Sequence, residues 1–193
     1  MLQSFKNDLL SLTASDIFRK YFCDSSTSKV LDSNQVLHLK NSITDEFKIS
    51  YSDINVVGSA RLGFSIKESR RFLDFGENSD IDVAIVSDDL FARVWEETVR
   101  YINESGEVYP QKKDFFKYLS QKGWIRPDKL PKSDYFPFTN DWKDFFRELT
   151  NSGKCGRYKI SAGIYYSPFF LEQYQIKSIL QCQMEISNEN NSN

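Results

Sequence analysis

Two aspartates one residue apart are the clearest candidates for chemistry in this chain. Asp80 and Asp82 alternate with apolar Ile81, Val83 and Ile85 in the period-2 pattern of a β-strand. On a strand that rises roughly 3.3 Å per residue, the two carboxylates project from one face about 6–7 Å apart and repel each other when half buried. A divalent cation between them removes that repulsion. Because no His or Cys stands nearby, the pair predicts a Mg²⁺ or Mn²⁺ site that also takes substrate phosphates as ligands.

A turn upstream supplies a second partner for such phosphates. Residues 53–57 read as a short apolar strand that stops at Gly58, and a helix is predicted from Ser59 onward. Gly58 lets the backbone turn without a Cβ, and the following amides point outward at a helix N-terminus, which favours anions. The Ser59 hydroxyl can reach a phosphate oxygen, and Arg61 can neutralise one.

Each half of this pattern also has a purely structural interpretation. Gly58 and Ser59 alone fit an ordinary strand-to-helix turn with a Ser N-cap. Asp80 and Asp82 alone fit the solvent face of an edge strand. Their conjunction, in this order and on these elements, favours a phosphate-gripping turn followed by a metal-binding strand.

The two segments together resemble the active-site signature of the nucleotidyltransferase superfamily typified by DNA polymerase β. The residues that carry the resemblance are Gly58-Ser59-Ala60-Arg61-x-Gly63-Phe64-Ser65 and Ser79-Asp80-Ile81-Asp82-Val83-Ala84-Ile85-Val86. This form is similar to stand-alone bacterial members, several of them associated with phage defence or toxin systems. The spacing between the segments is long, because residues 67–78 form a charged insertion.

The resemblance implies a metal-dependent enzyme that transfers a nucleoside monophosphate from an NTP or dNTP, such as ATP, to a hydroxyl acceptor. Asp80 and Asp82 then hold the metal, Gly58, Ser59 and Arg61 grip phosphates, and Lys159 or Arg157 stabilises the departing pyrophosphate. The acceptor is either a nucleotide 3′-hydroxyl, giving template-independent oligonucleotide synthesis in antiviral defence, or an RNA end or protein side chain, as in toxin-like relatives.

One departure from the superfamily pattern concerns a third carboxylate, which members present from a later strand. The candidate strand, residues 157–165, contains no acid. Asp134, Asp141 and Glu172 are substitutes in sequence. Either one of them folds into place, or the acceptor is activated differently, or the protein is a catalytically silent nucleotide-binding or assembly module.

The composition limits the remaining classes of function. With 25 basic and 27 acidic residues in 193, the net charge of −2 gives no global basic footprint for duplex binding, although a local basic cleft remains open. Cys23, Cys155 and Cys182 are odd in number and widely spaced, which fits a reducing cytoplasm. No secretion signal or membrane-spanning segment is expected. The 16 Phe and 10 Tyr predict some exposed aromatics, for a homo-oligomer or a partner protein.

The length and the hydrophobic periodicity predict a single α+β domain over residues 1–186, with N-terminal helices (1–50), a core (51–105), a C-terminal part of helices and a strand (106–186), and a disordered tail (187–193). The resemblance implies that the core contains a small mixed β-sheet of the nucleotidyltransferase type. Helices are predicted at 2–22 (one or two, with Thr13 or Ser15 as a cap), 34–48, 87–103, 110–121 and 141–150 and from Ser167 onward, a strand at 156–165, and a turn at 24–28.

The least regular stretch is the proline-interrupted run of residues 122–137, a length of connection that is usually functional or disordered. Trp124 and Arg126 within it have two interpretations. They either stack a base and contact a phosphate, as in proteins that bind single-stranded nucleic acid, or anchor the loop by packing.

Overall fold

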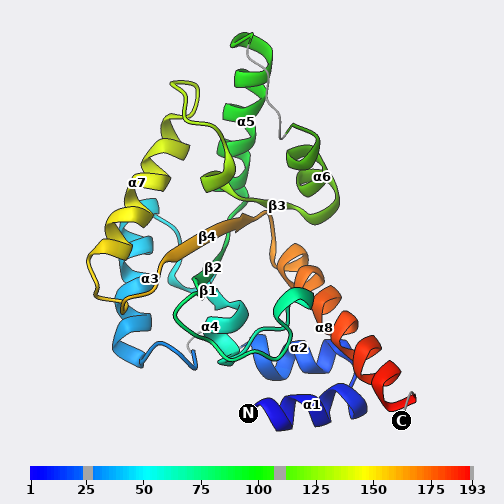
Figure 1. Cartoon of the computed structure of the whole chain (residues 1–193). Coiled ribbons are helices and arrows are strands. Elements are labelled where there is room, and N and C mark those ends of the chain that lie inside the picture. Colours follow the sequence, from blue (N-terminus) through cyan, green and yellow to red (C-terminus); the bar gives the residue numbers. More distant parts are fainter. Residues whose placement is uncertain (24–27, 107–111, 192–193) are drawn as a thin grey trace.

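The computed structural model describes residues 1–23, 28–106 and 112–191, which form an α+β structure (Figure 1). The helices are α1 (Leu2–Ser11), α2 (Ala14–Phe22), α3 (Ser33–Phe47), α4 (Gly58–Leu62), α5 (Asp88–Glu104), α6 (Lys112–Lys122), α7 (Pro137–Asn151) and α8 (Pro168–Asn191). The strands are β1 (Ile54–Val57), β2 (Ile81–Val86), β3 (Trp124–Ile125) and β4 (Ile160–Tyr165).

The four strands form one mixed sheet in the order β1-β2-β4-β3. β1 is antiparallel to β2, β2 is parallel to β4, and β4 is antiparallel to β3. The predicted small mixed sheet is therefore confirmed, and β2 lies inside it between β1 and β4. In Figure 1, α3 and α7 lie on one side of the sheet, and α8 with α1 and α2 on the other.

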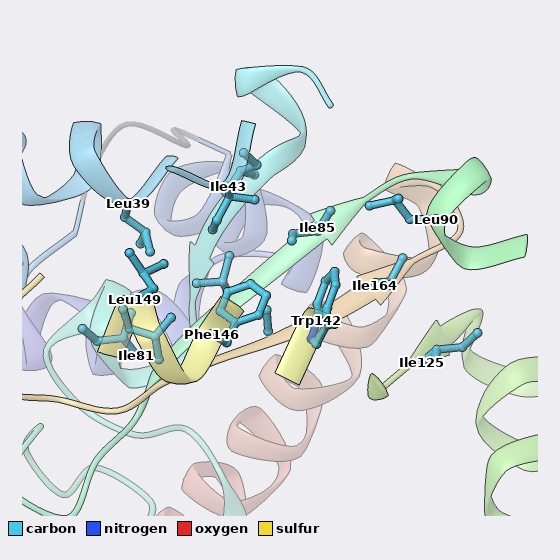
Figure 2. Close-up of a cluster of buried hydrophobic side chains, with 14 of the residues drawn as sticks. Leu39, Ile43, Ile81, Ile85, Leu90, Ile125, Trp142, Phe146, Leu149 and Ile164 are labelled. Atoms are coloured by element: carbon cyan, nitrogen blue, oxygen red, sulfur yellow. The ribbon is translucent and has the colours of Figure 1, made fainter. Parts of the chain in front are cut away.

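One face of the sheet builds the main hydrophobic core. Ile81 and Ile85 of β2 point toward α3, α5 and α7, as the alternating pattern predicts, and Ile164 of β4 lies beside them (Figure 2). Val83 belongs to the same cluster. Trp142 of α7 is only 1 % exposed in this cluster. Because the period of a strand is two, this packing leaves Asp82 and its neighbours at alternate positions on the opposite face.

Short polar side chains start α2 and α5 as the sequence predicts, and α3 has a cap that the sequence analysis did not single out. Thr13 accepts a hydrogen bond from the backbone N–H of Asp16 at the start of α2, and Ser87 accepts one from Leu90 at the start of α5. α3 begins with a capping box between Asp32 and Gln35. These caps satisfy amides that have no partner within the helix.

A second hydrophobic cluster joins both ends of the chain. Phe5 of α1 and Ile17 of α2 are fully buried against Ile179 and Cys182 of α8, together with Leu62 at the end of α4. The N-terminal helices and α8 thus support the segment that follows β1.

Several predicted boundaries need correction. β3 lies in the stretch predicted to be irregular, and α7 begins at Pro137 rather than at residue 141. α8 continues to Asn191, past residue 187 where the predicted tail begins. The predicted start of a helix at Pro110, residues 24–27 of the predicted turn, and residues 192–193 lie outside the described residues.

Glu97 explains the earlier start of α7. Its buried carboxylate accepts hydrogen bonds from the backbone N–H of Phe138 at 2.7 Å and of Thr139 at 3.2 Å, and from the Thr139 hydroxyl at 2.9 Å. A carboxylate from α5 thereby satisfies the first amides of α7 and complements the positive end of its dipole.

We expect Glu97→Gln to lower the free energy of unfolding by about 1–3 kcal/mol, because the NH₂ group of the Gln amide cannot accept a hydrogen bond from the buried donors that face it. Urea denaturation followed by circular dichroism measures this. Glu96→Gln, at the exposed neighbouring position, is the matched control and should change the free energy by less than about 0.5 kcal/mol. Equal effects of the two substitutions would contradict this role for Glu97.

Among the described residues, no helix combines the length and the apolar character needed to cross a bilayer.

Candidate functional site

The sheet face opposite the main core forms the floor of an open pocket of about 250 Å³. Val57 of β1 pairs with Asp82 of β2, and Asp82 pairs with Ser161 of β4. Because paired residues share a face, all three side chains point into the pocket, as does that of Tyr165 further along β4. The walls come from α4, the 67–78 insertion, β3 and α8.

The pocket brings together Asp80 and Asp82. Their side chains are 42 % and 28 % exposed, so both are half buried but reachable from solvent. Lys159 lies beside them, with its Nζ 3.9 Å from Asp80 Oδ2, and Lys67 of the insertion has its Nζ 3.8 Å from Asp82 Oδ2. Each acid thus faces one lysine, as expected of carboxylates that need positive charge.

The electrostatics of Asp82 also indicate that this carboxylate needs positive charge beside it. Burial raises the pKa of its carboxyl above the ordinary value, while Lys67 and Arg126 act in the opposite direction and Asp80 adds to the rise. The charged form of Asp82 is therefore incompletely compensated by the protein. A divalent cation at the pair would supply that compensation.

The predicted turn lies directly against the acid pair. Gly58 has φ +62°, in the left-handed region, and a Cβ placed on it would lie 3.0 Å from Asp82 Oδ2. The absence of a side chain thus brings the backbone close to the carboxylate. Ser59 lines the same pocket. α4 has only five residues, so an anion at this turn would meet its individual amides and the Ser59 hydroxyl rather than a long helix dipole.

Arg61 lies elsewhere than the sequence suggests. Its side chain does not line the pocket, the residue is only 5 % exposed, and its Nε donates a hydrogen bond of 2.6 Å to the backbone carbonyl of Tyr21. Arg61 therefore links α4 to α2 by a hydrogen bond and does not occupy the position predicted for a phosphate contact.

We expect Arg61→Gln to lower the free energy of unfolding by about 1–3 kcal/mol through loss of that buried charged hydrogen bond. The affinity for a Mg²⁺-nucleotide should not change, because Arg61 is outside the pocket. Chemical denaturation and calorimetric titration measure the two effects. Arg19→Gln, at a position with a 69 % exposed side chain on α2, is the control. A stable variant with clearly weaker nucleotide binding would restore Arg61 to the site.

The predicted third carboxylates do not reach the pocket. Asp134, Asp141 and Glu172 are absent from its described lining. The residue beside Asp82 on β4 is Ser161, whose hydroxyl donates to Asp80 Oδ2 at 3.4 Å. Within the described part of the chain, no group of three or more His, Cys, Asp or Glu side chains is placed to hold a metal.

The remaining lining includes residues that the sequence analysis left open or did not single out. Trp124 and Arg126 line the same pocket as the two aspartates. The pairing of β3 with β4 brings them there. The charged insertion contributes side chains, and so does the first half of α8. These further lining residues are Lys67, Arg70, Asp74, Tyr174, Gln175 and Ser178.

The donor set fits a hard divalent cation. Two carboxylates and nearby hydroxyls offer oxygen ligands only, which suits Mg²⁺ or Mn²⁺ with phosphate oxygens completing the coordination. The observation that supports this fit is the half-buried Asp82 beside Asp80, because burial raises the pKa of the Asp82 carboxyl despite the nearby Lys67.

Comparison of the chain with family models, with curated proteins and with solved structures finds no match.

Proposed function

We propose that this chain is a metal-dependent nucleotidyltransferase with a nucleotidyltransferase-type fold, and that the pocket binds a metal-bound NTP or dNTP. The observation that carries this proposal is the contact between the two predicted segments. The backbone of Gly58 approaches so closely that a Cβ there would lie 3.0 Å from Asp82 Oδ2. A phosphate on the turn would therefore be within reach of a metal on the acids.

Asp80 and Asp82 would hold the ion, which when bound would polarise the α-phosphate and neutralise charge on the departing pyrophosphate. Ser59 and the backbone amides of the turn hold the outer phosphates and orient the triphosphate. Lys67 and Lys159, now facing the two acids, add positive charge beside those phosphates. Orientation and charge neutralisation by these groups are the main sources of rate enhancement.

The reaction joins an acceptor hydroxyl oxygen to the α-phosphorus. The bond between that phosphorus and the oxygen bridging to the β-phosphate breaks, pyrophosphate leaves, and the hydroxyl proton passes to water or a pocket carboxylate. Asp74 also lines the pocket, from the insertion, whereas β4 carries Ser161 at the position paired with Asp82.

A second candidate is a silent nucleotide-binding module. The observation that favours it is Ser161 on β4, at the position paired with Asp82, where no acid stands. Such a module would bind the nucleotide through the same turn and acids without releasing pyrophosphate.

The proposal is tested by incubating the protein with all NTPs and dNTPs plus Mg²⁺ or Mn²⁺. Pyrophosphate release and elongated or protein-linked products, identified by mass spectrometry, support the enzyme. A rise in melting temperature with a nucleotide and no release supports the silent module. Absence of both effects would remove the nucleotide site altogether.

The biological setting follows as part of the same proposal. The spacing of the cysteines suits the cytoplasm, and the motif resemblance points to template-independent synthesis in antiviral defence or to toxin-like transfer to RNA or protein.

A further inference from the structure

The part of the pocket formed by β3 and α8 differs in character from the acid pair. Trp124, Tyr165 and Tyr174, which we call the aromatic end, line it. The indole of Trp124 is stacked with the Tyr165 ring at 5.9 Å and 17°, and lies 5.1 Å from the Tyr174 ring. Trp124 is only partly buried, so this ring cluster retains solvent-accessible surface.

A glycine keeps the Trp124 indole against the sheet. A Cβ at Gly163 of β4 would lie 2.2 Å from the indole Nε1, although the backbone of Gly163 is outside the left-handed region. Gly163 is therefore needed because a Cβ would clash with the Trp124 ring, and not because of its backbone conformation. This close packing fixes the plane of the indole along the pocket wall.

Two cations accompany these rings. Arg126 lines the pocket and is held by Asp128 through paired hydrogen bonds of 2.7 Å from Nε and Nη2, an arrangement that leaves Nη1 outside the fork. Lys122 has its Nζ 4.1 Å from the centre of the Tyr118 ring and 5.8 Å from that of Tyr174. A fixed guanidinium beside a flat apolar ring matches a phosphate attached to a nucleobase.

The strand order separates this region from the phosphate-binding turn. Gly58 follows β1 at one edge of the sheet, Asp82 is on β2, and Trp124 is on β3 at the other edge. If the triphosphate occupies the turn, the aromatic end lies on the other side of Asp80 and Asp82 and is free for a second substrate. A substrate bound there would approach the α-phosphate from the side opposite the turn.

We propose that the aromatic end binds the acceptor, and that this acceptor is the end of a single-stranded nucleic acid. Its terminal base lies on Trp124 and its phosphate at Arg126. The assignment as acceptor rests on the proposed function, whereas binding of a single strand does not. A single strand is favoured over a duplex because its unpaired terminal base is free to stack on a ring, and a protein hydroxyl supplies neither a phosphate nor a base for these groups. The net charge of −2 agrees with a local contact of this kind and not a long basic track.

Fluorescence anisotropy with a short, labelled single-stranded oligonucleotide tests the site. The titration is done in EDTA without NTP, so that neither a divalent cation nor a bound nucleotide contributes to binding. Arg126→Gln should weaken binding about tenfold and reduce the salt dependence by about one phosphate contact. Trp124→Leu should weaken it about tenfold, while Trp124→Phe, which keeps a ring, should remain within about threefold of wild type.

Matched controls separate these effects from general damage. Arg147→Gln removes an arginine that also pairs with an aspartate but is 63 % exposed on α7, and Trp95→Leu removes an indole that is 43 % exposed on α5. Both should bind the oligonucleotide like wild type. Circular dichroism and the melting shift with Mg²⁺-ATP report whether each variant is folded with an intact nucleotide pocket.

Two results would overturn the assignment. One is oligonucleotide affinity that is absent, or equal in the Arg126 and Trp124 variants and their controls, while Mg²⁺-ATP still raises the melting temperature. The other is label from an α-labelled NTP that appears only on protein. If Mg²⁺-ATP has no effect but the single strand binds through Trp124 and Arg126, the proposed function fails and the nucleic-acid site stands.

Discussion

Replacing Asp82 by Asn is expected to reduce pyrophosphate release by about 10³-fold, the upper end of the effect seen when one preorganised polar group is removed from a reacting centre. The amide retains the shape of the carboxylate, but it cannot supply the charge that a divalent cation requires. Asp80→Asn should have a loss of the same order, because the two side chains act on one ion.

The same substitution should not damage the metal-free fold. Since burial raises the pKa of Asp82 above 3.8, its ionised form costs folding free energy, and Asn removes that cost. The variant should equal or exceed wild type in melting temperature, with an advantage that grows as the pH rises from 3.8 through the folded pKa.

Asp88→Asn, in the first turn of α5 and outside the pocket lining, is the control for turnover and should leave it unchanged. Turnover that persists in both Asp80→Asn and Asp82→Asn would exclude the proposed enzyme.

Replacing Gly58 by Ala is expected to have the second largest effect. Its φ of +62° is costly for any residue with a Cβ, and the new Cβ would lie 3.0 Å from Asp82 Oδ2. The backbone strain should lower the free energy of unfolding by about 1–2 kcal/mol. The carboxylate must also shift, and a displacement on the order of 1 Å at a reacting centre costs about 10²-fold in rate.

Gly153→Ala separates strain from position. Gly153 has φ +67°, but a Cβ there meets nothing within 4 Å. It should show the same loss of stability in urea denaturation with a normal rate of pyrophosphate release. If both variants release pyrophosphate equally fast, the proximity of the turn to Asp82 has no functional role.

The elements that carry the site were predictable because their signals are local. β1, the turn at Gly58 and β2 each depend on a few consecutive residues whose alternation and lack of a Cβ dictate strand and bend. The shared face of Asp80 and Asp82 follows from the same periodicity. The caps at Thr13 and Ser87 are likewise decided within one turn of helix.

Other parts depend on contacts between segments distant in sequence. Arg61 turns away from the pocket because the carbonyl of Tyr21, 40 residues earlier, accepts its hydrogen bond. β3 has only two residues, so its strand character arises from pairing with β4 and not from periodicity. Gly163, a glycine within the predicted strand 156–165, could have indicated that a bulky side chain packs on it. Identifying that side chain as Trp124 requires knowledge of the pairing between β3 and β4.

The most direct test of the central claim is a crystal structure with Mn²⁺ and a non-hydrolysable nucleoside triphosphate, in which anomalous scattering locates the metal. We expect the Mn²⁺ peak at the carboxylates of Asp80 and Asp82, with the outer phosphates against Ser59 and the amides that follow Gly58. A triphosphate bound elsewhere, or one bound in the pocket with its metal away from both aspartates, would contradict the account.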